Sequence, residues 1–140
     1  MPIRSLVFVV ALSFATAAWA DDYRWKVLRV VDGDTLEIDG SWLPPELSRV
    51  YVRVRHLDTP EKGRLAKCPR ENEWSERATA FTRAAVEQAT DIMFRDLGWD
   101  KYGGRILAEV LVDGEPLSGK LIAAGLARPY EGKKKASWCD

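Results

Sequence analysis

The chain has 140 residues, in which 21 Lys and Arg side chains balance 21 Asp and Glu side chains. With 46% hydrophobic residues and six Trp, it has enough apolar surface to form a core, so a disordered chain is excluded. Two Cys and one His are too few for a four-ligand Cys/His zinc site, so any metal should be a hard cation held by oxygen atoms. Zero net charge argues against coating of nucleic acid through bulk basicity but leaves open the local handling of a phosphate.

Residues 1–20 have the pattern of a secretory signal peptide. Arg4 precedes a short apolar run that ends in the small-residue site Ala18-Trp19-Ala20. The alternative is a membrane anchor or a buried helix, but the run is shorter than the roughly 20 apolar residues that a spanning helix requires. We therefore expect cleavage after Ala20, export to the periplasm or the medium, and no stable membrane anchor afterwards. The remaining chain, residues 21–140, is expected to form a single, monomeric domain.

The rest of the chain predicts five short strands and two helices, without an internal repeat or a linker. The expected strands are Trp25–Val31, Thr35–Ile38, Val50–Arg55, Ile92–Phe94 and Ile106–Val112. A long helix should run from Glu71 to near Thr90, with an apolar face formed by Trp74, Ala78, Phe81 and Ala85, and a short helix should span Pro116–Ala124. Between them we expect a polar loop, Asp58–Arg70, too charged to pack, and a turn, Gly98–Gly104. This order fits a mainly β (α+β) fold, a five-stranded OB-type Greek-key barrel packed with two to three helices.

Both cysteines lie within the expected domain. An oxidising compartment favours a disulfide between Cys68 and Cys139, which would close a long loop and contribute roughly 4 kcal/mol by the chain-entropy model. The alternative is two free buried thiols. If the bond forms, it holds the C-terminal segment beside the loop that precedes the long helix.

Three clusters of charged residues stand at the ends of predicted strands. They are Asp32-Gly33-Asp34-Thr35, Asp58-Thr59-Pro60-Glu61 and Asp100-Lys101-Tyr102-Gly103-Gly104-Arg105. Each cluster taken alone is typical of an ordinary polar turn. Together with Arg53 they place carboxylates and two arginines in the loops at the mouth of a barrel, which is where OB folds bind their ligands.

These ordered motifs resemble those of the staphylococcal (thermo)nuclease family. The similarity extends from Trp25 to Tyr130 and includes the Leu107-Ala108 that follows the third cluster and the Gly125-Leu126-Ala127 after the last helix. It implies the OB barrel that the element order also predicts. It further implies Ca²⁺-dependent hydrolysis of phosphodiester bonds, with DNA, RNA or both as the substrate.

The resemblance implies a role for each matching residue. Asp34 and Asp58 match the carboxylate ligands of Ca²⁺, and the backbone carbonyl of Thr59 matches a further ligand. The catalytic set comprises the general base Glu61 and the two phosphate-binding arginines, Arg53 and Arg105. Oxygen ligands suit Ca²⁺, and guanidinium groups bind phosphate in a bidentate manner, so these residue types fit the chemistry.

Four further residues are expected to contact the substrate: Lys101, Tyr102, Tyr130 and Arg55. Gly103-Gly104 is one residue longer than the family's Tyr-Gly-Arg, and counting back from Leu107 keeps Arg105 in register with its strand. The sequence leaves open whether this extra residue displaces Lys101 and Tyr102 from the site. Tyr130 lies one residue short of the family's later tyrosine. Arg55 shares a strand face with Arg53.

The sequence contains two basic groups, namely Lys62, Arg64, Lys67 and Arg70 in the loop and Lys133–Lys135 near the C-terminus, and both lie near the proposed site if the disulfide forms. They form either a solvated surface or a local phosphate track. His56 is interpreted as a structural or solvent-facing residue. Two other interpretations compete with the enzyme: a catalytically inactive OB module that binds nucleic acid or a protein partner, and a calcium-stabilised structural domain.

Overall fold

The computed structural model describes residue 1 and residues 21–140, so the expected signal peptide falls almost entirely outside the described residues. Within the described part of the chain, none of the helices combines the length and the apolar character needed to cross a membrane.

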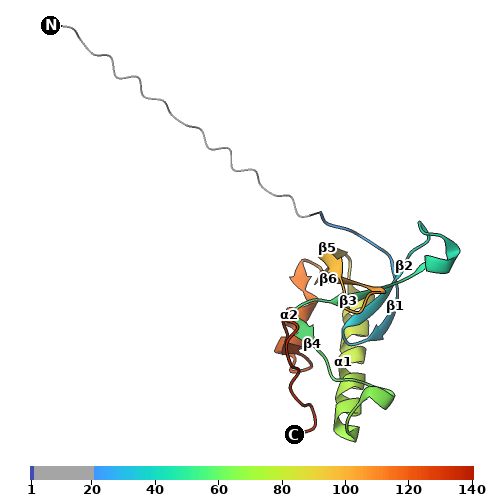
Figure 1. The fold of residues 1–140 in the computed structure, drawn as a ribbon, viewed down its shortest axis with the longest axis vertical. Helices are drawn as coiled ribbons and strands as arrows, with labels where there is room; N and C mark the ends of the chain where they lie inside the picture. The colour runs from blue at the N-terminus through green and yellow to red at the C-terminus, as the bar shows by residue number, and fades with distance from the viewer. Residues whose placement is uncertain (2–20) are drawn as a thin grey trace.

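The chain from residue 21 onward forms a mixed α+β fold (Figure 1). The strands are β1 (Val27–Asp32), β2 (Thr35–Asp39), β3 (Arg49–Val54), β4 (Leu57–Asp58), β5 (Ile92–Trp99), β6 (Arg105–Val112), β7 (Glu115–Pro116) and β8 (Arg128–Pro129). The helices are α1 (Pro69–Gln88) and α2 (Leu117–Ala123), and short 3₁₀ turns cover Pro45–Leu47 and Gly63–Leu65. The expected fold class is therefore confirmed, with three additional short strands, β4, β7 and β8.

The main sheet follows the order β1-β2-β3-β6-β5, with β7 added to β6, while β4 pairs with β8. All of these pairs are antiparallel except β3 and β6, which run parallel. At the far end of the order, Tyr23 and Phe94 exchange two backbone hydrogen bonds of 2.8 Å each. This bridge joins the chain just before β1 to β5, which brings the two ends of the strand order together as a barrel requires.

The core lies between the inner face of this sheet and the two helices. Its fully buried large side chains come from several strands and from α2: Leu36, Ile38, Val52, Val54, Leu57, Phe94, Val110, Leu117 and Leu121. Along β3, the buried residues Val52 and Val54 alternate with more exposed neighbours, as expected for a strand with one covered face. Along β2, by contrast, Thr35 and Glu37 are buried as well as Leu36 and Ile38. Both faces of β2 are therefore covered.

Strand β5 is longer than the sequence predicts. It continues from Phe94 to Trp99, and its pairing with β6 shifts between Arg95 and Gly98, as at a β-bulge. Asp96 lies in this shift with φ of 52°, and the Arg55 guanidinium packs against Gly98, where a Cβ atom would clash. The bulge interrupts the regular alternation of side chains along β5, so the sequence pattern does not show how far the strand continues. The predicted turn, Gly98–Gly104, therefore begins at a residue that still belongs to β5.

Helix α1 packs part of the predicted apolar face against the core, since Ala78 is buried and Phe81 and Ala85 pack against the core cluster, but it also buries polar side chains that were not predicted. Its buried side chains are Glu71, Ser75, Ala78, Thr79 and Thr82, whereas Trp74, Phe81 and Ala85 are half-buried. The prediction counted apolar residues only, but here polar side chains are buried because they form hydrogen bonds. The loop that precedes α1 also differs from the expectation, since Asp58 and Thr59 are buried at its beginning.

Candidate active site

The turn between β1 and β2 is held against α1. A Cβ atom on Gly33 would lie 2.8 Å from the Cβ of Ala78 and 3.1 Å from the Cγ2 of Thr59, so only glycine allows this approach. The Thr82 hydroxyl donates a hydrogen bond of 2.7 Å to the carbonyl of Gly33. The helix thereby fixes the position of Asp34, whose side chain is buried and accepts a hydrogen bond from the hydroxyl of Thr35.

Parallel pairing places Arg53 and Arg105 on one face of the sheet. Tyr51 pairs with Arg105 and Arg53 pairs with Leu107, so the two arginines lie two positions apart on neighbouring strands and point to the same side. The register that the sequence predicts for Arg105 is therefore correct. The extra residue is accommodated in the turn before β6, where Gly103 and Gly104 both have a φ of 72°.

Each of these arginines is oriented by a buried aspartate. Arg53 Nη2 lies 3.0 Å from Asp34 Oδ2, and Arg105 Nη2 lies 2.5 Å from Asp100 Oδ2. Burial raises the pKa of Asp100, but the backbone N–H of Tyr102 and the charge of Arg105 outweigh this effect, so the pKa of that carboxyl lies below its ordinary value. Asp100 therefore stays ionised and keeps the guanidinium of Arg105 in place.

Glu61 stands in a loop that Glu71 organises from α1. The buried Glu71 carboxylate accepts hydrogen bonds from the backbone N–H of Glu61 at 3.2 Å and of Lys67 at 2.7 Å. Asn72 accepts a further bond of 2.7 Å from the N–H of Gly63. The Glu61 side chain itself is 40% exposed. Its backbone is therefore held by Glu71, while its carboxylate remains accessible.

Asp58 is enclosed by the C-terminal segment. Its Oδ1 lies 2.6 Å from Lys135 Nζ, and its Oδ2 accepts a hydrogen bond of 3.2 Å from the indole N–H of Trp138. Lys135 Nζ also lies 3.2 Å from Glu61 Oε1. The predicted disulfide between Cys68 and Cys139 is present and ties this segment to the beginning of α1.

One cleft of about 840 Å³ gathers most of the predicted site residues. Its walls include Asp34, Thr59, Arg53, Glu61, Arg105, Arg55, Lys101, Tyr102 and Tyr130. Asp58 does not line this cleft but an adjoining pocket of about 250 Å³, together with Lys135 and Trp138. Lys101, Tyr102 and Trp99 are exposed where they line the cleft, so the longer turn does not remove Lys101 and Tyr102 from it.

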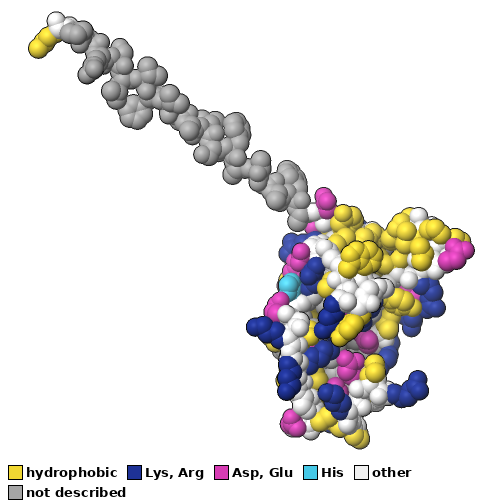
Figure 2. Space-filling model, viewed as in Figure 1, with side chains coloured by type: hydrophobic (Ala, Val, Ile, Leu, Met, Phe, Trp, Pro, Cys, Tyr) yellow, Lys and Arg dark blue, Asp and Glu magenta, His cyan; other side chains and the backbone are white. Residues whose placement is uncertain are grey.

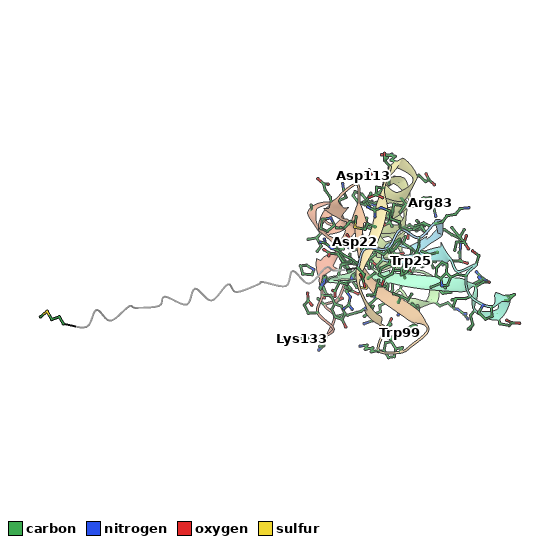
Figure 3. The ribbon with its side chains drawn as sticks, turned by 90° about the horizontal axis from the view of Figure 1, so that it is seen from above. Asp22, Trp25, Arg83, Trp99, Asp113 and Lys133 are labelled. Atoms are coloured by element: carbon green, nitrogen blue, oxygen red, sulfur yellow. A yellow bond between two sulfur atoms is a disulfide. The ribbon has the colours of Figure 1, made fainter. Side chains whose placement is uncertain are left out.

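The cleft opens on one side of the molecule. Figure 3 shows Trp99 and Lys133 on the same side, with Asp113 and Arg83 on the opposite one. In the view of Figure 2, Lys and Arg side chains are spread over the left and lower parts of the surface, whereas hydrophobic side chains gather at the upper right.

Three residues of the two predicted basic groups make contacts within the protein, and of these only Lys135 pairs with carboxylates. Lys62 Nζ donates to the carbonyl of Val31 at 2.7 Å, and Arg70 donates to the carbonyl of Asp140 at 2.9 Å. His56 lies at the edge of the cleft, 47% exposed, with its Nδ1 3.1 Å from Glu131 Oε1. These side chains hold the loop and the C-terminal segment in position.

Asp32 and Asp34 flank Gly33 and influence each other electrostatically. Burial, together with the nearby charge of Asp34, raises the pKa of Asp32 to about 6. The negative charges of Asp32 and Asp34 lie close together, so a cation between them would reduce their repulsion. For Lys135, burial lowers the pKa, but the hydrogen bonds and charges of Asp58 and Glu61 outweigh burial and raise it above its ordinary value. Lys135 therefore remains an ammonium ion beside two carboxylates.

The donor set fits a hard divalent cation. Asp32, Asp34, Asp58 and the carbonyl of Thr59 offer only oxygen atoms, which are the ligands that Ca²⁺ prefers, and Arg53 is the cation that Asp34 contacts at present. Within residues 21–140, no group of three or more Asp, Glu, His or Cys side chains is already gathered as a complete ligand cluster. Asp58 instead contacts the ammonium group of Lys135.

Three residues of the site were missed by the sequence analysis. Asp32 was interpreted as part of an ordinary turn, although its place beside Asp34 was a usable signal. Asp100 was interpreted as a turn residue, and its pairing with Arg105 could have been inferred from the hairpin. Lys135 was placed near the site only as part of the C-terminal basic group, and its contacts with Asp58 and Glu61 were not predicted.

Comparison with known proteins identifies one family. A sequence model described as "Staphylococcal nuclease homologue" matches residues 51–138. The chain is 28% identical to an "Uncharacterized endonuclease" of Escherichia coli over 92% of this chain and 75% of the relative. It is 32% identical to a "Thermonuclease" of Staphylococcus hyicus over 78% of this chain and 60% of that protein. A "Micrococcal nuclease" of Shigella flexneri is 30% identical over 66% of this chain and 41% of its own length.

Proposed function

Because the chain belongs to the family of staphylococcal nuclease homologues, we propose that it is a nuclease that hydrolyses phosphodiester bonds of DNA, RNA or both, with Ca²⁺ as its metal. Relatives named as a thermonuclease, a micrococcal nuclease and an endonuclease support a nuclease-type hydrolase. The observation that carries the proposal is the single cleft lined by Asp34, Arg53, Glu61 and Arg105. These side chains come from four separate segments of the chain.

Arg53 and Arg105 bind the phosphate of the scissile bond. Both guanidinium groups point to the same side of the sheet and are held by Asp34 and Asp100, so little side-chain entropy remains to be lost when the phosphate binds. Guanidinium groups remain charged at all physiological pH values and bind phosphate oxygens in pairs. Their charge also stabilises the negative charge that develops on the phosphate during attack.

Glu61 is the general base. Its carboxylate is 40% exposed at the cleft, while its backbone is fixed by Glu71, so it can meet a water molecule without moving its loop. It orients that water toward the phosphorus atom and accepts its proton, a contribution of typically about 10²–10⁴-fold in rate. The ammonium of Lys135, now near Glu61, must withdraw before Glu61 acts as a base.

Asp34, Asp58 and the carbonyl of Thr59 are proposed to hold the Ca²⁺, with Asp32 close enough to add its charge. When bound, Ca²⁺ neutralises charge on a phosphate oxygen and orients water. The exposed side chains of Lys101 and Tyr102 stand on the rim of the cleft, where they would contact the polymer beyond the reacting phosphate. Arg55 and Tyr130, which line the same cleft, would extend this contact.

The decisive experiment is digestion of plasmid DNA and of RNA in millimolar Ca²⁺ or in EGTA. Wild type should degrade at least one polymer in Ca²⁺ and neither in EGTA, and Glu61→Gln should be reduced by about 10²-fold or more. Glu73→Gln is the matched control, since Glu73 is an exposed glutamate on α1 that pairs with Arg77. If wild type leaves both polymers intact, the proposal fails and the chain is a binding module, which a gel-shift assay on the same substrates would detect.

We also propose that the protein is exported as a monomer after cleavage behind Ala20. The disulfide supports this location, because such bonds persist in oxidising compartments. Mass determination of the protein recovered from the periplasm and the medium tests it. A mass that still includes residues 1–20 would contradict export by cleavage, and size-exclusion chromatography would reveal an oligomer.

A further inference from the structure

Lys135 occupies a position between two carboxylates that have proposed roles in the reaction. Its ammonium nitrogen lies 2.6 Å from Asp58 Oδ1 and 3.2 Å from Glu61 Oε1. The side chain of Asp58 is only 6% exposed, and that of Lys135 is 37% exposed. A positive charge therefore reaches a buried carboxylate from the side of the C-terminal segment.

The segment that carries Lys135 is held by several independent contacts. Trp138 donates its indole N–H to the second oxygen of Asp58, and the guanidinium of Arg128 stacks on the Trp138 ring at 3.8 Å. Arg128 also donates to the carbonyl of Ser137 at 2.7 Å. Beyond these, the bond between Cys68 and Cys139 prevents the segment from leaving entirely. In Figure 1 the C-terminal chain runs close to β4 and ends near the beginning of α1.

These contacts place the ammonium group in competition with a divalent cation at Asp58, because two positive charges at one buried carboxylate repel each other. The two oxygens of Asp58 are engaged by Lys135 and Trp138, so a metal that uses Asp58 must take an oxygen from one of them. The disulfide keeps Lys135 near the carboxylates at a high effective concentration, because the tethered group diffuses only within a small volume. A tethered ammonium thus competes continuously with any cation in solution.

We propose that Lys135 is a built-in competitor of the divalent cation, which lowers the affinity of the site and thereby sets the metal concentration at which the site fills. Cation binding displaces Lys135 from Asp58 and Glu61, and this frees Glu61 to act on water. The segment from Lys133 to Trp138 then moves on its disulfide tether. The inference rests on the proposed function, since it takes Asp58 as a metal ligand.

Calorimetric titration of the metal-free protein with Ca²⁺ tests the proposal without any substrate. Lys135→Met keeps the length of the side chain and removes its charge, and it should bind Ca²⁺ with a Kd about tenfold lower than wild type. Lys134→Met is the matched control, because it removes the same charge from the neighbouring, exposed residue. Its Kd should stay within about twofold of the wild-type value, since long-range charge effects between exposed groups are screened.

A second measurement follows the displacement of the segment. Trp138 donates to Asp58, so its fluorescence should change when Ca²⁺ binds, and this change should be absent in Trp138→Phe. The double variant Cys68→Ser/Cys139→Ser removes the tether, and its Kd for Ca²⁺ should fall toward that of Lys135→Met. A Kd of the double variant equal to that of wild type would overturn the role of the tether.

The competition is overturned if Lys135→Met binds Ca²⁺ no more tightly than Lys134→Met, or if neither binds Ca²⁺ at all. Its failure is distinguishable from failure of the proposed function. A protein that degrades DNA or RNA in Ca²⁺ and shows equal Kd values in both Lys variants remains a nuclease without the competitor. A protein that binds Ca²⁺ more tightly in Lys135→Met but degrades neither polymer has the competitor without the nuclease.

Discussion

The hydroxyl group of Thr82 donates a 2.7 Å hydrogen bond to the backbone carbonyl of Gly33, across the contact between α1 and the turn that carries Asp34. Thr82 is fully buried, so this bond is protected from water. A polar group buried in this way is costly unless it is paired, and here both partners are satisfied by each other. The long helix therefore positions the acidic turn of the candidate site in addition to covering the core.

Gly33→Ala is expected to lower the free energy of unfolding by about 1–3 kcal/mol, because the new Cβ overlaps Ala78 and forces the turn away from α1. The same shift moves Asp34 and should weaken Ca²⁺ binding. Gly119→Ala is the control, since a Cβ at that position in α2 meets nothing within 4 Å and should be neutral or stabilising. Urea unfolding measures both, and equal stabilities would contradict the tight contact.

Glu71→Ala should reduce kcat more than it changes KM, because the loop that carries Glu61 loses its buried acceptor while Arg53 and Arg105 are untouched. The variant should also be less stable by about 2–3 kcal/mol, since two backbone N–H groups lose a charged partner. Glu73→Ala removes an exposed glutamate from the same helix and serves as the control. A Glu71→Ala protein with wild-type kcat would show that the loop is positioned by other contacts.

The disulfide should contribute about 4 kcal/mol to the free energy of unfolding, because it joins residues separated by 71 positions in the sequence. Urea unfolding of the oxidised protein with and without a reducing agent measures this contribution. The double variant Cys68→Ser/Cys139→Ser should match the reduced wild type and be insensitive to the reducing agent. A double variant as stable as the oxidised protein would contradict the estimate.

Asp32→Asn should change how stability depends on pH in the presence of EDTA. The pKa of Asp32 is about 6 in the folded protein and 3.8 as the ordinary value, so between these pH values the folded state binds more protons than the unfolded state. The contribution of Asp32 to stability therefore declines as pH rises from about 4 to about 6. Asparagine does not ionise, so the variant should lack this decline and be about 1–2 kcal/mol more stable at pH 7. Identical pH profiles from thermal unfolding would contradict the shift.

Local alternation in the sequence was sufficient to predict much of the sheet. The run Val50–Arg55 predicted a strand with Arg53 and Arg55 on one face, and β3 forms there within one residue at each end. Counting from Leu107 placed Arg105 correctly, because side-chain direction in a strand has a period of two. The order of the elements and the family motifs both predicted the fold class, and the expected export favoured pairing of Cys68 with Cys139 over two free thiols.

The remaining features depend on contacts between distant segments. The length of β5 was underestimated because Asp96 adopts a φ of 52° at a bulge, which no periodic pattern indicates. The buried face of α1 was predicted only in part, because Thr82 and Glu71 are buried by hydrogen bonds to loops, whereas the prediction weighed hydrophobicity alone. The place of Lys135 depends on the disulfide and on Trp138 together, so it becomes visible only in three dimensions.

The parallel pairing of β3 with β6 has a consequence for how the protein reaches its native state. Antiparallel neighbours such as β1 and β2 are joined by a short turn and can pair early, whereas β3 and β6 are separated by α1 and β5 and must close a long loop first. During refolding, the juxtaposition of Arg53 and Arg105 should therefore appear later than the helical signal. No fragment that lacks either strand retains this pair of arginines, so the phosphate binding proposed for them requires the assembled chain.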